Sequence, residues 1–131
     1  MLLICASSQG ILTAQDYQNF PAADLRTIDQ LWTNQSGGHF GLAIQKQIWE
    51  TVTGDAEGSW EQVCQFGDAV GWRKDGAWLY ESDLSFDLSA PLGHLPCDLV
   101  CHYTEGKKGI LRGGAAFVAL FGKFLLSRED W

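Results

Sequence analysis

The sequence lacks the short motifs by which many enzymes are recognised. It has no GxGxxG, GxSxG or HExxH segment, so nothing supports dinucleotide binding, nucleophile-elbow hydrolysis or zinc-peptidase chemistry. The basic run GKKGILRGG at 106–114 lacks the Walker A spacing of a phosphate-binding loop. His39, His94 and His102 each lie beside a predicted turn, where a lone histidine is more often solvated than catalytic. A non-catalytic binding protein is therefore favoured over an enzyme.

Positive charge is scarce, because nine Lys and Arg oppose sixteen Asp and Glu for a net charge of −7. So acidic a chain argues against nucleic acid or an anionic membrane face as the main partner. The distribution is uneven: residues 1–100 carry −9 (four basic, thirteen acidic) and residues 101–131 carry +2 (five basic, three acidic). Lys107, Lys108 and Arg112 lie close together there. They either bind a small anion or belong to an ordinary solvated loop.

The cysteines are too few and too scattered to indicate a disulfide framework. Four are present without a CxxC pair, and a chain of this size can rely on an apolar core, so free thiols are predicted. The alternative is a metal site formed by Cys97 and Cys101 with His94 and His102. No second ligand pair has zinc-like spacing, so no metal is predicted. The four cysteines are Cys5, Cys64, Cys97 and Cys101.

No apolar run is long enough to cross a bilayer. Residues 1–6 (MLLICA) are too short, and no charged segment precedes them, which makes them a poor signal peptide. Residues 115–126 are also short, and Gly122 interrupts them. A soluble, unexported chain is expected, and its abrupt apolar start suggests that a preceding helix is missing.

Apolar and aromatic residues, by contrast, are plentiful. Hydrophobic residues make up 46% of the 131 positions against 19% charged, which is enough for one domain with a sizeable core. Six Trp and seven Phe are many for this length. They either fill that core or offer a surface to a flat apolar ligand.

The segment 20–50 dominates the predicted fold as two helices separated by a glycine break. Pro21 suits a first helical position and Asp24 the first turn, while Ser36-Gly37-Gly38 ends the first helix. Apolar residues recur at helical spacing in both halves. The two stripes are Leu25, Ile28, Leu31 and Trp32, and then Ile44, Ile48 and Val52.

Short helices are predicted on both sides of this pair. Thr13, followed three residues later by Asp16, resembles a capping box and predicts a helix over 14–19. Ser59 is placed to cap another helix that runs to Phe66.

The second half of the chain changes period. Asp75-Gly76 between two extended runs predicts a small hairpin over 70–80. Residues 85–96 are expected to be irregular, and residues 115–126 to form a closing helix. Three apolar residues are expected to hold the irregular segment down: Phe86, Leu88 and Leu95. The predicted fold is mainly α, a compact single helical domain with one small β-hairpin and long ordered loops.

Five segments occur in a specific order along the chain: FPAADLRTIDQLW, SGGHFGLAIQKQIWE, VGWR, the Trp78–Leu79 pair and FDLSAPLGHLP. Together they closely resemble the genomes-uncoupled-four (GUN4-like) family, the tetrapyrrole-binding regulators of magnesium chelatase in cyanobacteria, algae and plants. The resemblance runs from about Leu2 to Pro96. Segments of this length and order are hard to obtain by chance.

The resemblance implies a domain organisation, a ligand and a partner, none of which composition indicates. It implies one domain over 1–131, lacking the helix or helical bundle that precedes it in the family. It implies a non-catalytic protein that binds protoporphyrin IX or its magnesium complex, or a bilin, and stimulates magnesium chelatase through its large, porphyrin-binding subunit. The implied protein is a monomer in a cyanobacterial cytoplasm or a plastid stroma, with peripheral membrane association and no nucleic-acid partner.

The family builds its binding face from two loops, one before the FP motif and one around the end of the hairpin and after GHLP. Transferred to this sequence, they imply apolar contacts to the macrocycle from Leu12, Tyr17, Trp78, Leu79 and Tyr80. Lys107, Lys108 and Arg112 are proposed from position and charge alone as partners of the propionates.

The sequence departs from the family in two places. The preceding helix is absent, and GLAIQ at 41–45 stands where GFSVQ is common. Two alternatives therefore remain beside the chelatase activator. One is a porphyrin or bilin sensor without chelatase stimulation, and the other is a degenerate interaction domain that has lost its ligand.

Overall fold

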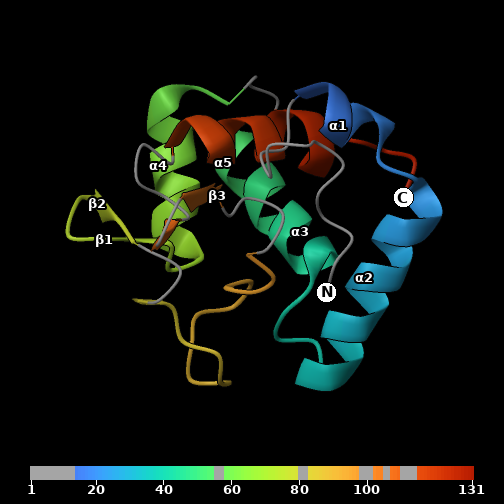
Figure 1. Ribbon diagram of the computed structural model, residues 1–131, viewed down its shortest axis with the longest axis horizontal. Helices are drawn as coiled ribbons and strands as arrows, with labels where there is room; N and C mark the ends of the chain where they lie inside the picture. Colours follow the sequence, from blue (N-terminus) through green and yellow to red (C-terminus); the bar gives the residue numbers. More distant parts are fainter. Residues whose placement is uncertain (1–13, 55–57, 80–82, 98–101, 105–106, 110–114) are drawn as a thin grey trace.

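The computed structural model describes residues 14–54, 58–79, 83–97, 102–104, 107–109 and 115–131, with main-chain positions only between 102 and 117. The fold is mainly helical, as predicted. Its helices are α1 (Ala14–Asn19), α2 (Ala22–Ser36), α3 (Leu42–Thr53), α4 (Trp60–Ala69), α5 (Ala115–Phe121) and the π-helix η2 (Gly122–Leu126). Helix α3 lies between α2 and α4, and α5 with η2 crosses one end of α4 and α3 and contacts α1 (Figure 1). The predicted last turn of a helix at residues 2–6 lies outside the described residues.

The ends of the helices follow local chemistry that the sequence carries. Helix α2 ends where Gly37 takes the left-handed conformation and its N–H donates to the Thr33 carbonyl. Pro21 is the N-cap of α2, so the helix begins one residue later than predicted. Helix α4 begins with a complete capping box, in which Ser59 Oγ accepts from the Gln62 N–H and Gln62 Oε1 accepts from the Ser59 N–H.

The stripe predicted for α2 is partly wrong. Leu25 and Ile28 are buried, and Trp32 packs against the core, but Leu31 is 48% exposed. The buried positions continue instead to Ser36, one turn after Trp32. Leu31 is therefore rotated away from the line along which α2 contacts the core.

In α3 the fully buried face is also not the predicted one. Its buried positions are Leu42, Gln45, Trp49 and Thr53, while Ile44, Ile48 and Val52 are half-buried. Two of the four buried residues are polar, and a stripe search that counts only apolar residues overlooks them. Each polar side chain is hydrogen-bonded: Thr53 Oγ1 donates to the Trp49 carbonyl, and Gln45 binds a loop.

Aromatic rings form the centre of the core. Trp49 packs edge to face on Phe66 at 5.4 Å between centroids, and Phe66 packs likewise on Trp72 at 5.7 Å. Phe121 joins Trp72 at 6.1 Å and Tyr17 at 6.0 Å. This chain of five rings links α3, α4, the first hairpin segment, α5 and α1, so core packing accounts for much of the aromatic content.

Two small antiparallel sheets complete the fold. The predicted hairpin is confirmed as β1 (Arg73–Lys74) and β2 (Ala77–Trp78), and Asp75 and Gly76 both have positive φ (53° and 81°), as a type I′ turn requires. The second sheet pairs β3 (His102–Thr104) with β4 (Lys107–Gly109). It was not predicted, because Lys and Gly have low strand propensity.

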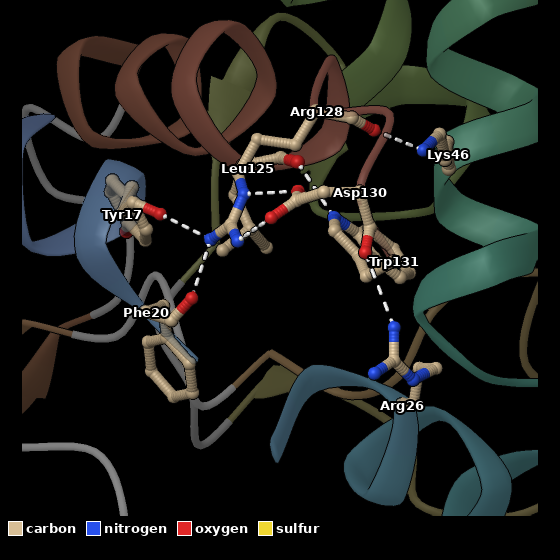
Figure 2. A network of polar contacts seen from close by, with 8 residues as sticks. All are labelled: Tyr17, Phe20, Arg26, Lys46, Leu125, Arg128, Asp130 and Trp131. Atoms are coloured by element: carbon tan, nitrogen blue, oxygen red, sulfur yellow. Dashed lines mark hydrogen bonds and ion pairs between the residues drawn. The ribbon is translucent and has the colours of Figure 1, made fainter. Parts of the chain in front are cut away.

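The last residues of the chain bind its first helix (Figure 2). The Arg128 guanidinium donates to the Tyr17 carbonyl at 2.9 Å and to the Phe20 carbonyl at 2.7 Å, both at the end of α1. Its other nitrogens bind both Asp130 carboxylate oxygens, at 2.8 and 2.6 Å. Arg128 thus supplies positive charge at the C-terminus of a helix, where carbonyls are otherwise unpaired.

The same segment also contacts α2 and α3. Arg26 of α2 donates to the Asp130 carbonyl at 3.2 Å, and Lys46 of α3 donates to the Arg128 carbonyl. Lys46 Nζ also lies 4.6 Å from the centre of the Trp131 ring. Arg128, Asp130 and Trp131 are together called the C-terminal clasp, since they join three helices that are separate in sequence.

Candidate functional site

An apolar groove of about 180 Å³ lies between the second half of α2 and the irregular segment 83–96 (gold and orange in Figure 1). On the helix side it is formed by Trp32, Gln35 and Ser36, with Phe40 just beyond the helix. Its outer wall, residues 85–90, contributes Phe86, Asp87 and Leu88, and Leu95 completes the lining. The groove brings five large apolar side chains together on an open, described surface: Trp32, Phe40, Phe86, Leu88 and Leu95.

Two residues of the outer wall are unusually exposed. Phe86 is 62% and Leu88 is 59% solvent-exposed, so the prediction that they hold the segment down is wrong. Leu95, at 1%, does so as predicted. The reason is a local turn in which the Asp87 carboxylate accepts from the Ser89 N–H at 2.9 Å. This turn satisfies the backbone without burying the neighbouring apolar side chains.

The turn between α2 and α3 holds one end of the wall. His39 Nε2 donates to the Ala90 carbonyl at 2.6 Å, and the Gly93 N–H donates to the His39 carbonyl at 3.0 Å. The Gly41 N–H donates to the Leu95 carbonyl, also at 3.0 Å. The FG and GHLP segments of the sequence are therefore joined through their backbones.

Gln45 extends this connection into the core. Its side chain is fully buried, and Nε2 donates to the Gly93 carbonyl at 3.0 Å and to the Pro96 carbonyl at 2.8 Å. Its Oε1 atom is buried with no partner among the residues that the structure describes. Gln45 thus serves to fix the path of the chain behind the groove.

His94 holds the other end of the wall. Its Nδ1 lies 2.6 Å from the Val70 carbonyl, and its Nε2 accepts from the Ser85 N–H at 3.2 Å. The indole N–H of Trp72 donates to the His94 carbonyl at 2.6 Å. The side chain is only 3% exposed, and this burial lowers the pKa of the imidazole below its usual value, although the hydrogen bond to Val70 acts the other way.

The predicted site residues whose side chains are described do not line this groove. Tyr17 is 2% exposed and packs on Phe121 in the core. The ring of Trp78 lies so close to Gly67 that a Cβ added there would come within 2.4 Å of it. Leu79 is half-buried against the core. Their contact with a ligand stays a prediction.

The remaining predicted residues lie largely beyond what the structure describes. Leu12, Tyr80 and Arg112 fall outside the described residues. Lys107 and Lys108 are on β4, opposite Thr104 and Tyr103, and only their main chain is described. Propionate binding by these residues therefore remains a prediction. The basic run at 106–114 contains a strand rather than only a loop.

Neither metal ligands nor a membrane-spanning helix can be assigned within the described ranges. No group of three or more His, Cys, Asp or Glu side chains there is arranged to hold a metal ion. Of the histidines and cysteines considered for zinc, His94 uses both ring nitrogens in hydrogen bonds, and Cys97 is 1% exposed. None of the helices in the same ranges has the length and apolarity that a bilayer crossing requires.

Comparison with known proteins gives a consistent result. The family model described as GUN4-like matches residues 3–110. A Ycf53-like protein of Synechocystis sp. is 34% identical over 92 residues, covering 70% of this chain and 36% of that protein. The chloroplastic tetrapyrrole-binding protein of Arabidopsis thaliana is 27% identical over 116 residues, covering 81% and 41% respectively. The chain thus spans less than half the length of these relatives.

A comparison with solved structures points to the same family as the sequence comparisons. The ligand-free structure of Arabidopsis thaliana GUN4 superposes with a TM-score of 0.58 at 27% identity, covering 92% of this chain and 69% of that chain. Fold and groove together define a mainly helical domain with a partly apolar groove on its surface. The chain belongs to the GUN4-like family, as the sequence motifs predicted.

Proposed function

We propose that this chain binds a tetrapyrrole, with one edge of the macrocycle in the groove between Trp32 and Phe86. The proposal rests on one observation above all, the exposure of Phe86 and Leu88 in the lining of a mainly apolar groove. Water-exposed aromatic and aliphatic side chains on an open face gain free energy when a flat apolar ring covers them. A relative named for tetrapyrrole binding makes that ring system the first candidate.

The groove suits part of such a ligand in size and chemistry. Its volume of about 180 Å³ is below the range of about 300–1,000 Å³ that encloses a whole small molecule. A bound macrocycle would therefore extend beyond it. Contacts from Leu12 and Tyr80 are proposed from the family resemblance alone. Lys107, Lys108 and Arg112 are proposed to bind the propionates.

The proposed ligands are protoporphyrin IX and its magnesium complex, and the proposed role is to present them to the large subunit of magnesium chelatase. The setting is then a cyanobacterial cytoplasm or a plastid. A sensor that binds a porphyrin or bilin without stimulating the chelatase is the second possibility. The name of the Arabidopsis thaliana relative refers to tetrapyrrole binding, which both roles share.

Titration with deuteroporphyrin IX, followed by the Soret band, tests ligand binding. Phe86→Ala is expected to weaken affinity by about five- to thirtyfold, the loss of one covered aromatic side chain. Trp60→Ala is the matched control, since Trp60 is 65% exposed on α4 and is not part of the groove lining. No Soret change at micromolar pigment, or equal effects of the two variants, would show that the groove is not the site. A chelatase assay with and without the protein then separates activator from sensor.

A further inference from the structure

The outer wall of the groove is held at its two ends by two histidines. At residue 85 the Ser85 N–H donates to His94 Nε2, and at residue 90 the Ala90 carbonyl accepts from His39 Nε2. Between these points the Asp87 carboxylate accepts from the N–H and the hydroxyl of Ser89, its hydrogen-bond partner among the described residues. Leu84 and Ala90 are also buried, and the Ala90 N–H donates to the Asp87 carbonyl at 3.1 Å. The two imidazoles add to these anchors in fixing the position of Phe86 and Leu88.

The two imidazoles use their nitrogens differently. His94 must donate from Nδ1 to the Val70 carbonyl and accept at Nε2 from the Ser85 N–H, which only the neutral Nδ1–H tautomer can do. His39 donates from Nε2 to the Ala90 carbonyl, and an imidazolium can make the same bond. A second proton therefore removes the wall contact of His94 and leaves that of His39 in place.

The surroundings of His94 favour the neutral form. It is packed among Gly71, Pro91 and the Trp72 indole, and both ring nitrogens are already bonded to the backbone. The described charged side chains on the neighbouring segments are Asp68, Arg73, Asp83 and Asp87. Asp68 and Arg73 pair with each other at 3.2 Å, Asp87 binds Ser89, and burial rather than any of these charges lowers the pKa of His94.

We propose that His94 is a positioning residue for the tetrapyrrole groove and makes ligand affinity dependent on pH. In its neutral form it fixes Ser85 and hence the wall that carries Phe86. A proton on Nε2 would place two N–H groups against each other, so the wall is released and the apolar groove loses its shape. This inference concerns regulation of the site proposed for the tetrapyrrole and rests on that function.

The test compares His94→Asn with His39→Ala in the full chain. Asparagine keeps a donor at the δ position for the Val70 carbonyl but has no acceptor for Ser85. At about pH 7.5, we expect His94→Asn to bind deuteroporphyrin IX about three- to tenfold more weakly than wild type, the effect of one lost hydrogen bond. As the pH is lowered, wild type and His94→Asn are expected to converge, because protonation removes the same contact.

His39→Ala serves as the control for pH. It is expected to weaken binding by a similar factor at every pH, so that its affinity stays parallel to that of wild type while the ligand's own titration affects all three proteins alike. The series stops at the lowest pH at which circular dichroism shows all three proteins folded. Parallel curves for wild type and His94→Asn, or equal affinities at about pH 7.5, would overturn the assignment.

Amide hydrogen exchange in the absence of ligand tests whether His94 holds the wall in place, and this test does not depend on the proposed function. We expect the Ser85 amide to exchange faster in His94→Asn than in wild type, while amides in the middle of α3 are unchanged. If wild type binds no porphyrin, the proposed function fails, but this exchange difference still supports the role of His94 in the wall. Equal protection of Ser85 in both proteins would refute that role whatever the binding result.

Discussion

At the scale of single residues, the polar side chains of the signature segments bind backbone groups of the same chain. His39, Gln45 and His94 each contact carbonyl or N–H groups of the segments 70–71 or 85–96. Sequence alone identified Gln45 and His94 as parts of motifs, but their partners are 48 and 24 residues away. Local pattern cannot reveal such contacts, because chain topology decides which backbone groups face a side chain.

Gln45→Leu should lower the free energy of unfolding by about 2–4 kcal/mol. The substitution keeps much of the volume but leaves the buried carbonyls of Gly93 and Pro96 without their donor. Urea denaturation followed by Trp fluorescence measures the change. Gln47→Leu is the matched control, because it makes the same chemical change on the exposed face of α3 and should be nearly neutral. Equal midpoints for the two variants would contradict the importance of the buried bonds.

Acid should destabilise the chain through His94 before it affects the carboxylates. Burial lowers the pKa of His94 in the folded state, so the unfolded chain binds the proton first as the pH falls. The contribution of His94 to stability is therefore complete above about pH 6.5 and is lost progressively below it. Arg128 lowers the pKa of Asp130, whose contribution is lost only below about pH 4.

Urea denaturation at several pH values checks this order. Between about pH 7 and about pH 5 the free energy of unfolding should fall more steeply in wild type than in His94→Asn. Identical slopes would mean that another group carries the acid sensitivity.

At the scale of secondary-structure elements, a feature could be predicted from the sequence when the interaction that forms it joins residues close together in the chain. The helix cap at Ser59 and the turn at Asp75-Gly76 were predicted because both ends of each interaction lie within a few residues. Leu31 and Phe86 were misassigned because apolarity and spacing do not specify where a helix or loop meets the core. The groove was missed for the same reason. Alternation of Phe86 and Leu88 with Asp87 and Ser89 was the available signal of a solvent-facing turn.

The junction of α5 and η2 gives a prediction at this scale. A Cβ on Gly122 would come within 2.5 Å of the Trp49 ring, which is 4% exposed and packs on Phe66. The ring cannot move aside, so the clash should exceed the gain of about 1 kcal/mol in helix propensity. Gly122→Ala should therefore destabilise the protein by about 1–3 kcal/mol.

Thermal denaturation measures the effect of Gly122→Ala. Lys123→Ala, at the exposed neighbouring position, should leave the midpoint nearly unchanged. A midpoint for Gly122→Ala equal to or above that of wild type would show that the backbone yields at this junction.

At the scale of the whole molecule, we expect the C-terminal clasp to keep α1 docked. A helix of six residues is unstable alone, and Arg128 binds its terminal carbonyls with a side chain that is only 14% exposed. Arg128→Ala should lower stability by about 2–3 kcal/mol, with the exposed Asp130 partner contributing little. Amide exchange in 14–20 should accelerate more than exchange in α3.

Arg26→Ala is the appropriate comparison, because it removes one exposed hydrogen bond to the same segment. It should change global stability by less than about 1 kcal/mol and leave α1 protected. If α1 exchanged at the wild-type rate in Arg128→Ala, the Tyr17 ring in the core would suffice to hold this helix.

The clasp also has a consequence for folding during translation, because α1 can bind Arg128 only after nearly the whole chain has been made. Its bonds to Tyr17 and Phe20 span 111 and 108 residues, so α1 leaves the ribosome long before its partner has been translated. Tyr17 of α1 meets its core partner Phe121 only when α5 has been translated, and α1 gains its two bonds to Arg128 last. Contacts of such long sequence separation slow folding and prolong exposure of apolar side chains. A chain arrested before Arg128 should therefore be recognised by chaperones even though α2, α3 and α4 are complete.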